Sequence, residues 1–240
     1  MIRIDSADHA RHRTSPARPT RGHGTPTALL VAHREMQLTP GLELYREGQR
    51  ADAPYMVVSG ILRVSVSLID GRERLVDLVG PGDVVGAAAL EAAEHAETVV
   101  AAEDGAVVAQ IDLAKVLGGR RSRQALTSAL VKQLVRSREL ADDLGLPMGA
   151  RICRILARLA MRLGESSDVP EVGDKIGWRH LPFALTHDDV ALLAGCARVT
   201  ATRVMGDLKE SGVLSGSRGD YALVPAALLR AADDYVCDVI

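Results

Sequence analysis

Arg198 and Arg203 stand near the C-terminal end of the chain, with a short run of valine, threonine and alanine between them. A guanidinium group can bond to O6 and N7 of guanine at once, and an exposed valine can contact the methyl group of thymine. Threonine hydroxyls and lysine bind phosphates. These residues predict the reading of duplex DNA. The predicted DNA-binding residues are Arg198, Val199, Thr200, Thr202, Arg203, Lys209, Arg218 and Thr186.

Residues 186–211 have the pattern of a helix-turn-helix that would position these side chains. Thr186 and Asp189 form a predicted capping box, and Gly195 ends the first helix. The second helix is predicted over Arg198–Ser211, and its N-terminal residues would meet base edges. Its core face is predicted from the i, i+3, i+4, i+7 spacing of Ala201, Val204, Met205 and Leu208. The alternative is an ordinary helical bundle, in which two short helices with a glycine turn also occur.

The segments on either side predict a wing and two further helices. Residues 213–224 favour two short strands around a Gly-rich turn, with Arg218 at its tip, and 226–236 favour a last helix. Residues 175–184 are expected to form a hairpin or strand pair. Upstream, 148–163 predicts a helix with isoleucine and leucine inside and four arginines turned outward, namely Arg151, Arg154, Arg158 and Arg162.

The N-terminal half has the signals of short strands. Between Leu38 and Asp112, glycine-containing turns recur at short intervals, which is typical of a small barrel or jelly roll. Residues 62–68 alternate with a period of two, and Asp70-Gly71 predicts a hairpin turn. The face predicted to be buried consists of Leu62, Val64, Val66 and Leu68.

A short helix over 112–117 and a long helix over 122–144 are expected next, and Gly145-Leu146-Pro147 is expected to end the long helix and act as a hinge. A long helix beside a closed barrel has one barrel to pack on, so the rest of its apolar stripe needs a partner. That partner is either a two-fold copy of the helix or the second domain. The predicted stripe is Ala125, Leu126, Ala129, Leu130, Leu134, Leu140, Ala141 and Leu144.

Composition excludes several classes of protein. The net charge of −2 argues against a polybasic coat, so DNA contacts must come from a local basic patch. The three cysteines, without a CxxC pair, argue against a disulfide framework, zinc site or iron–sulfur cluster, and we expect buried thiols, no metal and no cofactor. Without a P-loop, GxGxxG, HExxH or GxSxG motif we expect no enzyme. Without an apolar run of membrane-spanning length we expect a cytoplasmic protein.

From about residue 38 to 236 the chain resembles the Crp/Fnr regulators. The glycines of the first half fit that family, and the run Pro81-Gly82-Asp83-Val84-Val85-Gly86 is typical of it. The second helix of the helix-turn-helix is most similar to that of the NtcA subgroup, and Val199 stands where most Crp and Fnr helices have glutamate. The resemblance implies a half-site of GTA type, in a palindrome such as GTA-N8-TAC.

The resemblance also implies an α+β fold with an N-terminal cyclic-nucleotide-binding-type β-roll (a double-stranded β-helix), a long dimerisation helix and a C-terminal winged helix-turn-helix. The corresponding domains are the β-roll (26–120), the dimerisation helix (121–146) and the DNA-binding domain (147–240). Residues 1–25 are rich in Arg, His, Pro, Thr and Gly and nearly free of large apolar side chains, which predicts a flexible arm. The implied partners are double-stranded DNA, a second copy of the chain and RNA polymerase.

The segment that would bind an effector departs from the cyclic-AMP receptors. They have glutamate after the glycine at Gly86 and an Arg-Ser pair further on, where this chain has Ala87 and Glu97-Thr98. A glutamate facing a phosphate repels it, so we expect no binding of cyclic AMP. The residues of this degenerate pocket are Gly86, Ala87, Ala88, Glu97 and Thr98.

His95 belongs to the same segment. We interpret it as an exposed loop histidine between Glu94 and Glu97, with ligation of haem or a metal as the alternative. The sequence thus leaves two functions open. The chain is a dimeric transcription factor with a degenerate effector pocket, or it is a regulatory module that senses a ligand other than cyclic AMP, such as a 2-oxoglutarate-like molecule or haem, with weak DNA specificity.

Overall fold

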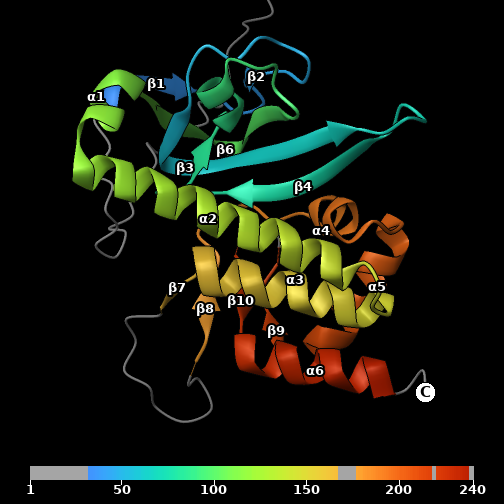
Figure 1. Cartoon of the computed structure of the whole chain (residues 1–240). Coiled ribbons are helices and arrows are strands. Elements are labelled where there is room, and N and C mark those ends of the chain that lie inside the picture. The colour runs from blue at the N-terminus through green and yellow to red at the C-terminus, as the bar shows by residue number, and fades with distance from the viewer. Residues whose placement is uncertain (1–31, 167–176, 218–219, 238–240) are drawn as a thin grey trace, which may run out of the picture.

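The computed structural model describes residues 32–166, 177–217 and 220–237. The predicted N-terminal arm and Arg218 lie outside these residues. In the described part, the first half of the chain forms an antiparallel β-roll and the second half a helical unit edged by short strands. Together they make a mixed helix and sheet fold, as predicted (Figure 1).

The β-roll is built from strands that pair in the order β1-β6-β3-β4, with β2 added to β6 and β5 added to β3. Their bounds are β1 Ala32–Leu38, β2 Glu43–Tyr45, β3 Tyr55–Ser67, β4 Glu73–Val79, β5 Val84–Val85 and β6 Thr98–Ile111. Long aliphatic side chains fill the interior, among them Val57, Leu62, Val79, Val99 and Val108, each fully buried. Because the sequence has few aromatic residues, valine and leucine make up most of this core.

The strict alternation predicted over 62–68 is correct only in part. Leu62 and Val64 are buried, but Ser65 is buried as well, and Val66 and Leu68 are only half-buried. The cause is a register shift between Val64 and Ser65 in the pairing of β3 with β4, because a bulge changes which side chains face inward.

The predicted hairpin turn between β3 and β4 is confirmed. The Leu68 amide donates to the Arg72 carbonyl, and Gly71 has a φ of 80°, which a residue with a Cβ rarely adopts. Ile69 lies fully exposed at the tip of this hairpin.

Two helices follow the roll. Helix α1 (Leu113–Gly118) is capped by the Asp112 carboxylate, and α2 spans Arg120–Asp143. The first half of α2 packs Ala125 and Leu126 onto β-roll residues that include Met56 and Ile111. The remainder of the predicted stripe is less covered than expected, since Leu134 is 70% exposed.

The helical unit begins after a short non-helical segment, Leu144–Pro147, which includes the Gly145-Leu146-Pro147 predicted to end the long helix. Helix α3 (Met148–Leu163) packs beside α6 (Pro225–Cys237), with α4 (His187–Ala194) and α5 (Arg198–Glu210) against them. Short strands pair in the order β7-β8-β10-β9, with bounds β7 Glu165–Ser166, β8 Arg179–His180, β10 Ala222–Leu223 and β9 Leu214–Ser215. The predicted wing is the β9–β10 pair. The strand expected within 175–184 is β8, which pairs with β7 and β10 and forms no hairpin of its own in the described residues.

The arginines of α3 do not point outward as predicted. Arg154 and Arg158 both contact the Asp143 carboxylate, which is almost fully buried, and Arg162 contacts Asp77 of β4. Their spacing marks a polar face, but that face meets α2 and β4 instead of solvent. The expectation of buried thiols is fully confirmed for only one cysteine, because Cys196 is half-buried. Cys153 is buried, which raises its thiol pKa to about 12, whereas Cys237 is exposed.

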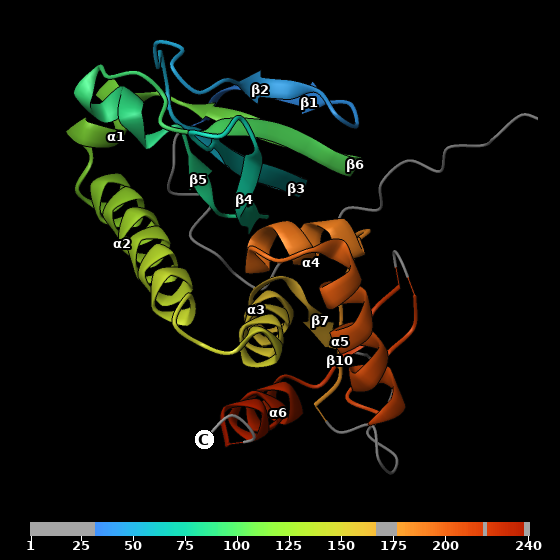
Figure 2. The ribbon, with the colours of Figure 1, turned by 90° about the vertical axis from the view of Figure 1, so that its right-hand side faces the viewer.

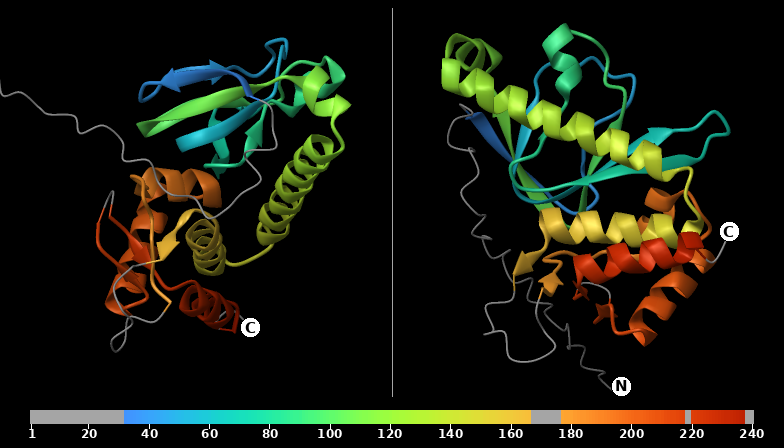
Figure 3. Two further views of the ribbon diagram at one scale, coloured as in Figure 1. Left: turned by 90° about the vertical axis from the view of Figure 1, so that its left-hand side faces the viewer. Right: turned by 60° about the horizontal axis from the view of Figure 1, so that its bottom comes forward.

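The β-roll packs against the helical unit, where β4 contacts α4. Figure 2 shows α4 next to the end of β4, and Figure 3 shows α3 and α6 side by side, with α5 on the far side of α3 from α2. Among the described helices, none is both long enough and apolar enough to cross a membrane.

Candidate nucleic-acid interface

Helix α4 begins with the predicted capping box. The Asp189 amide donates to Thr186 Oγ1 at 3.0 Å, while Asp189 Oδ2 accepts from the Thr186 amide at 3.0 Å and from its hydroxyl at 2.7 Å. Gly195 then ends the helix with a φ of 68°. Because the Thr186 side chain is engaged in this cap, the structure places it as a helix-capping residue at the edge of the surface.

Helix α5 has the two faces that its spacing predicts. The inner face is buried, with Ala201, Val204, Met205 and Leu208 at most 3% exposed. On the opposite side, Val199 is 79% exposed and Arg203 is also exposed. Because Val199 is exposed together with Arg198 and Arg203, this end of α5 is a candidate contact surface.

The two arginines of this surface differ in their surroundings. Arg198 Nη1 lies 3.5 Å from Asp188 Oδ2 of α4, and both side chains are more than half exposed. Such an exposed pair contributes little to stability, so the guanidinium is readily released to another acceptor. In the described part of the chain, no hydrogen bond or ion pair is found for Arg203.

His187 connects three elements of this surface, and the sequence reasoning missed it. Its Nδ1 lies 3.0 Å from Thr202 Oγ1 on α5, and its Nε2 lies 3.1 Å from the Tyr221 hydroxyl beside β10. Burial, together with the positive charges of Lys209 and Arg198, lowers the pKa of His187 below its usual range. A neutral imidazole therefore bridges the first helix, the second helix and the wing.

The remaining predicted residues lie around this bridge. Thr202 is exposed, but its hydroxyl is engaged with His187. The Nζ of Lys209 lies 5.4 Å from the centre of the Tyr221 ring, at the side of the wing. Thr200 is half-buried on the flank of α5. The structure thus brings Arg198, Val199, Thr200, Thr202, Arg203 and Lys209 onto one helix, and Thr186 onto the neighbouring α4 cap.

The helix-turn-helix is fixed to the rest of the protein at both ends of α4. At its N-terminal end, Arg63 of β3 forms an ion pair with Asp189, and Asp104 Oδ2 accepts from the Ala184 amide at 3.2 Å. At its C-terminal end, the Arg151 guanidinium donates to the Ala194 carbonyl at 2.8 Å and to the Leu144 carbonyl beyond α2 at 2.6 Å. These contacts join residues far apart in the sequence, so local patterns gave no signal for them.

Two side chains of the predicted effector segment form hydrogen bonds within the protein. Gly86, with a φ of 75°, leads into the short 3-10 helix η2 (Ala87–Glu91), which contains Ala87 and Ala88. Glu97 Oε1 accepts from the Tyr45 hydroxyl at 2.9 Å, and Thr98 Oγ1 accepts from the Glu47 amide at 3.0 Å. Of the residues predicted to line a pocket, Glu97 and Thr98 therefore have partners inside the protein, and Thr98 also lines a cavity of about 430 Å³ together with Glu47 and Ser65.

His95 is not an exposed loop histidine, as the sequence interpretation had it. It is 4% exposed, and its ring stacks on Tyr45 with 3.6 Å between ring centres and 7° between planes. Burial lowers the pKa of His95, so the ring is neutral and packs as an aromatic side chain. The neighbouring charged residues suggested solvent, and the tyrosine that covers the ring lies far away in sequence.

Comparisons with known proteins agree with both halves of the structure. Residues 35–118 match the cyclic nucleotide-binding domain family, and residues 150–232 match the Crp-like helix-turn-helix domain family. A transcriptional regulator of Thermus thermophilus, LdrP, is 30% identical over 191 residues, which cover 79% of this chain and 92% of LdrP. The cyclic AMP receptor protein of Thermus thermophilus is 28% identical over 219 residues, which cover 84% of this chain and 89% of the receptor.

Two solved structures share the fold. A CRP-family transcriptional regulator from Thermus thermophilus has a TM-score of 0.66 at 24% identity, covering 85% of this chain and 98% of its own. FixK2 from Bradyrhizobium japonicum has a TM-score of 0.68 at 22% identity, covering 84% of this chain and 98% of its own. The β-roll, the long helix and the winged helix-turn-helix therefore recur together in other proteins.

Proposed function

Because the chain belongs to the Crp/Fnr family of transcriptional regulators, we propose that it binds a palindromic site on double-stranded DNA as a homodimer and reads each half-site with the N-terminal end of α5. The observation that carries this proposal is the division of α5 into a fully buried inner face and an outer face with exposed Val199 and Arg203. In helix-turn-helix proteins this end of the second helix lies in the major groove.

Arg198 and Arg203 are the proposed guanine readers, and Val199 is the proposed contact for a thymine methyl. Glutamate at the position of Val199 would accept a hydrogen bond from a cytosine amine, and valine has no such acceptor. The half-site is therefore of GTA type, in a palindrome like GTA-N8-TAC, and the helix belongs with the NtcA subgroup. Thr200, Thr202, Lys209 and Arg218 supply phosphate contacts, and Thr186 holds the α4 cap beside them.

Gly206 supports the choice of the outer face. It lies on the same side of α5 as Val199 and Arg203, and a Cβ added there would meet nothing within 4 Å. A glycine inside a helix costs about 0.5–1 kcal/mol relative to alanine. Since packing inside the chain does not require this glycine, close approach of the DNA backbone is the reason that we assign to it.

The proposed dimer forms through α2. Val131, Leu134 and Val135 are 52%, 70% and 51% exposed and lie next to one another on the helix. The alternative was that α2 packs against the helical unit of the same chain. That unit leaves these three side chains uncovered. A two-fold copy of α2 would bury them and place two α5 helices on one duplex. The domains are then the arm (1–25), the β-roll (26–120), the dimerisation helix (121–146) and the DNA-binding domain (147–240).

The β-roll keeps the family architecture with a degenerate nucleotide pocket, and we propose that it does not bind cyclic AMP. The Tyr45–Glu97 hydrogen bond and the stacked His95 support this. The regulator acts with RNA polymerase, has no enzymatic activity and works in the cytoplasm, where the DNA is.

Selection of binding sites from a random duplex library tests the proposed function. The protein should enrich an inverted repeat with GTA and TAC half-sites. Enrichment of no common motif, or of a motif without inverted symmetry, would contradict it.

A further inference from the structure

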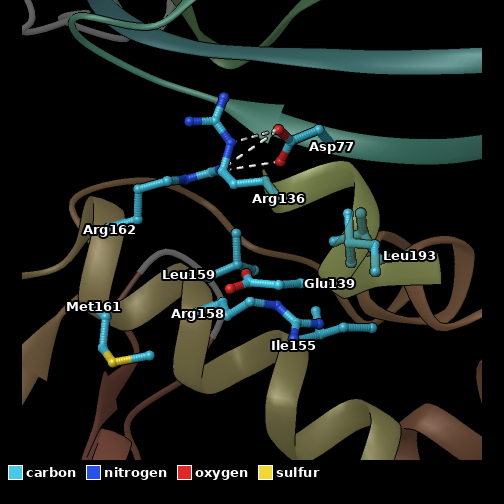
Figure 4. Close-up of a pocket in the computed structure, with 10 residues that line it drawn as sticks. Asp77, Arg136, Glu139, Ile155, Arg158, Leu159, Met161, Arg162 and Leu193 are labelled. Atoms are coloured by element: carbon cyan, nitrogen blue, oxygen red, sulfur yellow. Dashed lines mark hydrogen bonds and ion pairs between the residues drawn. The ribbon is translucent and has the colours of Figure 1, made fainter. Parts of the chain in front are cut away.

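A cavity of about 250 Å³ lies where β4, α2, α3 and α4 meet, and its lining includes none of the residues predicted for the effector pocket or for DNA contacts (Figure 4). From its lining, we propose that this cavity binds a small amphipathic monocarboxylate. The carboxylate is held by Arg158, and the apolar body contacts Leu140, Ile155, Leu159 and Leu193.

The apolar part of the lining favours an apolar body. Ile155, Leu159 and Leu193 are at most 6% exposed, and Leu140 is partly buried beside them. Protein interiors leave few voids larger than a water molecule, and an apolar cavity of about 150 Å³ stays dry and takes up benzene. Met161, which is 52% exposed, also lines the cavity and marks its open side.

Ion pairs fix the walls of the cavity. Asp77 of β4 accepts from Arg162 of α3 at 2.9 and 3.2 Å and lies 3.4 Å from Nε of Arg136 of α2. Arg136 also donates to Asp83 at 2.8 Å. In Figure 4 the side chains of Asp77, Arg136 and Arg162 lie on the β4 side of the cavity, with Leu159 and Ile155 on the α3 side. These two arginines are balanced by two carboxylates, so they supply no free positive charge.

Arg158 supplies the charge that a carboxylate needs. It shares the buried Asp143 carboxylate with Arg154, whose Nε is 2.7 Å from Asp143 Oδ1, so two guanidinium groups face one carboxylate. Arg158 is held there through Nη2, and no other hydrogen bond of its guanidinium is found among the described residues. A guanidinium has five N–H donors, and the remaining ones can receive a carboxylate from the cavity.

Glu139 limits the ligand to a single negative charge. It lines the same cavity, is exposed, and has no hydrogen-bond or ion-pair partner within the described part of the chain. Asp143 and one ligand carboxylate together balance the charges of Arg154 and Arg158, so a second ligand carboxylate would find only the negative charge of Glu139 and be repelled. A dicarboxylate is therefore disfavoured, and a monocarboxylate with an apolar tail fits.

The cavity joins the β-roll, the long helix and the first helix of the helix-turn-helix. A ligand that binds one arrangement of these elements more tightly than another changes the affinity of the protein for DNA. By thermodynamic linkage, DNA then changes the affinity of the protein for the ligand by the same factor. This consequence depends on the proposed DNA function, but direct binding of the ligand does not.

Calorimetric titration of the full chain with octanoate, and with octanol as the uncharged molecule of equal chain length, tests the proposal without DNA. We expect one octanoate per chain, bound at least about tenfold more tightly than octanol, which corresponds to about 1.4 kcal/mol. Equal affinities, or no binding of octanoate, would overturn the proposal.

Three variants locate the site. Met161→Trp fills the open side, and Arg158→Lys keeps a charge for Asp143 but loses the planar fork, so both should weaken octanoate binding, whereas Glu139→Gln should strengthen it. Leu42→Trp, at another exposed apolar residue in the β-roll, is the matched control and should bind as the unmodified chain does. Unchanged affinity in both Met161→Trp and Arg158→Lys would place the ligand elsewhere and contradict the assignment.

Discussion

Arg63 of β3 forms an ion pair with Asp189, the same residue that completes the capping box at the start of α4. The Asp189 side chain is 5% exposed and that of Arg63 is 31% exposed. The Asp189 carboxylate therefore caps the first helix of the helix-turn-helix and also attaches this helix to the β-roll.

Replacing Arg63 with alanine should destabilise the protein by about 1–3 kcal/mol, because the buried Asp189 carboxylate loses its charged partner. Urea unfolding followed by circular dichroism measures this. Arg46→Ala is the control, since the Arg46–Glu43 pair is exposed and should contribute less than about 1 kcal/mol. Equal effects of the two substitutions would show that the Arg63–Asp189 contact does not support the fold.

The neutral His187 bridge makes stability depend on pH. Because its pKa is lower in the folded protein than in the unfolded chain, the unfolded chain binds the proton more readily. The bridge thus stabilises fully above the unfolded value of about 6.5, and this contribution is lost as the pH falls through the lower folded value.

Unfolding free energies of the unmodified chain and of His187→Gln, at about pH 7 and about pH 5.5, test this. The unmodified chain should lose more stability on acidification than the variant. The lowered pKa of His95 acts in the same direction, but His95 is present in both proteins and cancels in the comparison. An equal loss in both proteins would exclude a neutral His187 as the cause.

Leu134→Arg should convert the proposed dimer into a monomer. The side chain is 70% exposed in one chain, so arginine there is tolerated by the fold, but a two-fold copy of α2 would place two charges together. Sedimentation velocity measures the mass, with Leu229→Arg on α6 as the control at another exposed leucine. A monomeric unmodified chain, or a dimeric Leu134→Arg variant, would contradict dimerisation through α2.

Calorimetric titration with cyclic AMP should give no binding. Glu97 stands where the resemblance to the cyclic-AMP receptors implies an arginine, and its carboxylate accepts a hydrogen bond from Tyr45. A phosphate placed beside Glu97 would be repelled by this carboxylate, which the Tyr45 hydroxyl holds in place. Micromolar affinity would show that the segment rearranges in spite of these contacts.

The predictions that succeeded rest on local signals. The Thr186–Asp189 cap, the buried face of α5 and the turn at Gly71 each depend on a few neighbouring residues whose conformational preferences agree. The approximate bounds of α2, α3 and α6 follow from the same kind of pattern. The family resemblance added the arrangement of the parts, which spacing alone does not determine.

The predictions that failed depend on contacts between distant segments. The arginines of α3 were assigned to solvent because a polar helix face looks the same whether it meets water or buried carboxylates. His95 was assigned to an exposed loop because its neighbours are charged, but Tyr45 covers its ring. His187 gave no signal of its own, since Thr202 and Tyr221 become its partners only after folding.

The DNA affinity of Arg203→Ala tests the central claim, that the outer face of α5 reads base sequence. Arg203 has no partner inside the described part of the chain, so its loss leaves the fold intact, and Arg230→Ala, at an exposed arginine on α6, is the matched control. Fluorescence anisotropy on a GTA-N8-TAC duplex should show a loss of about 1–3 kcal/mol for Arg203→Ala only, with little change on a scrambled duplex of equal length. Unchanged affinity, or an equal loss on both duplexes, would contradict base reading by this helix.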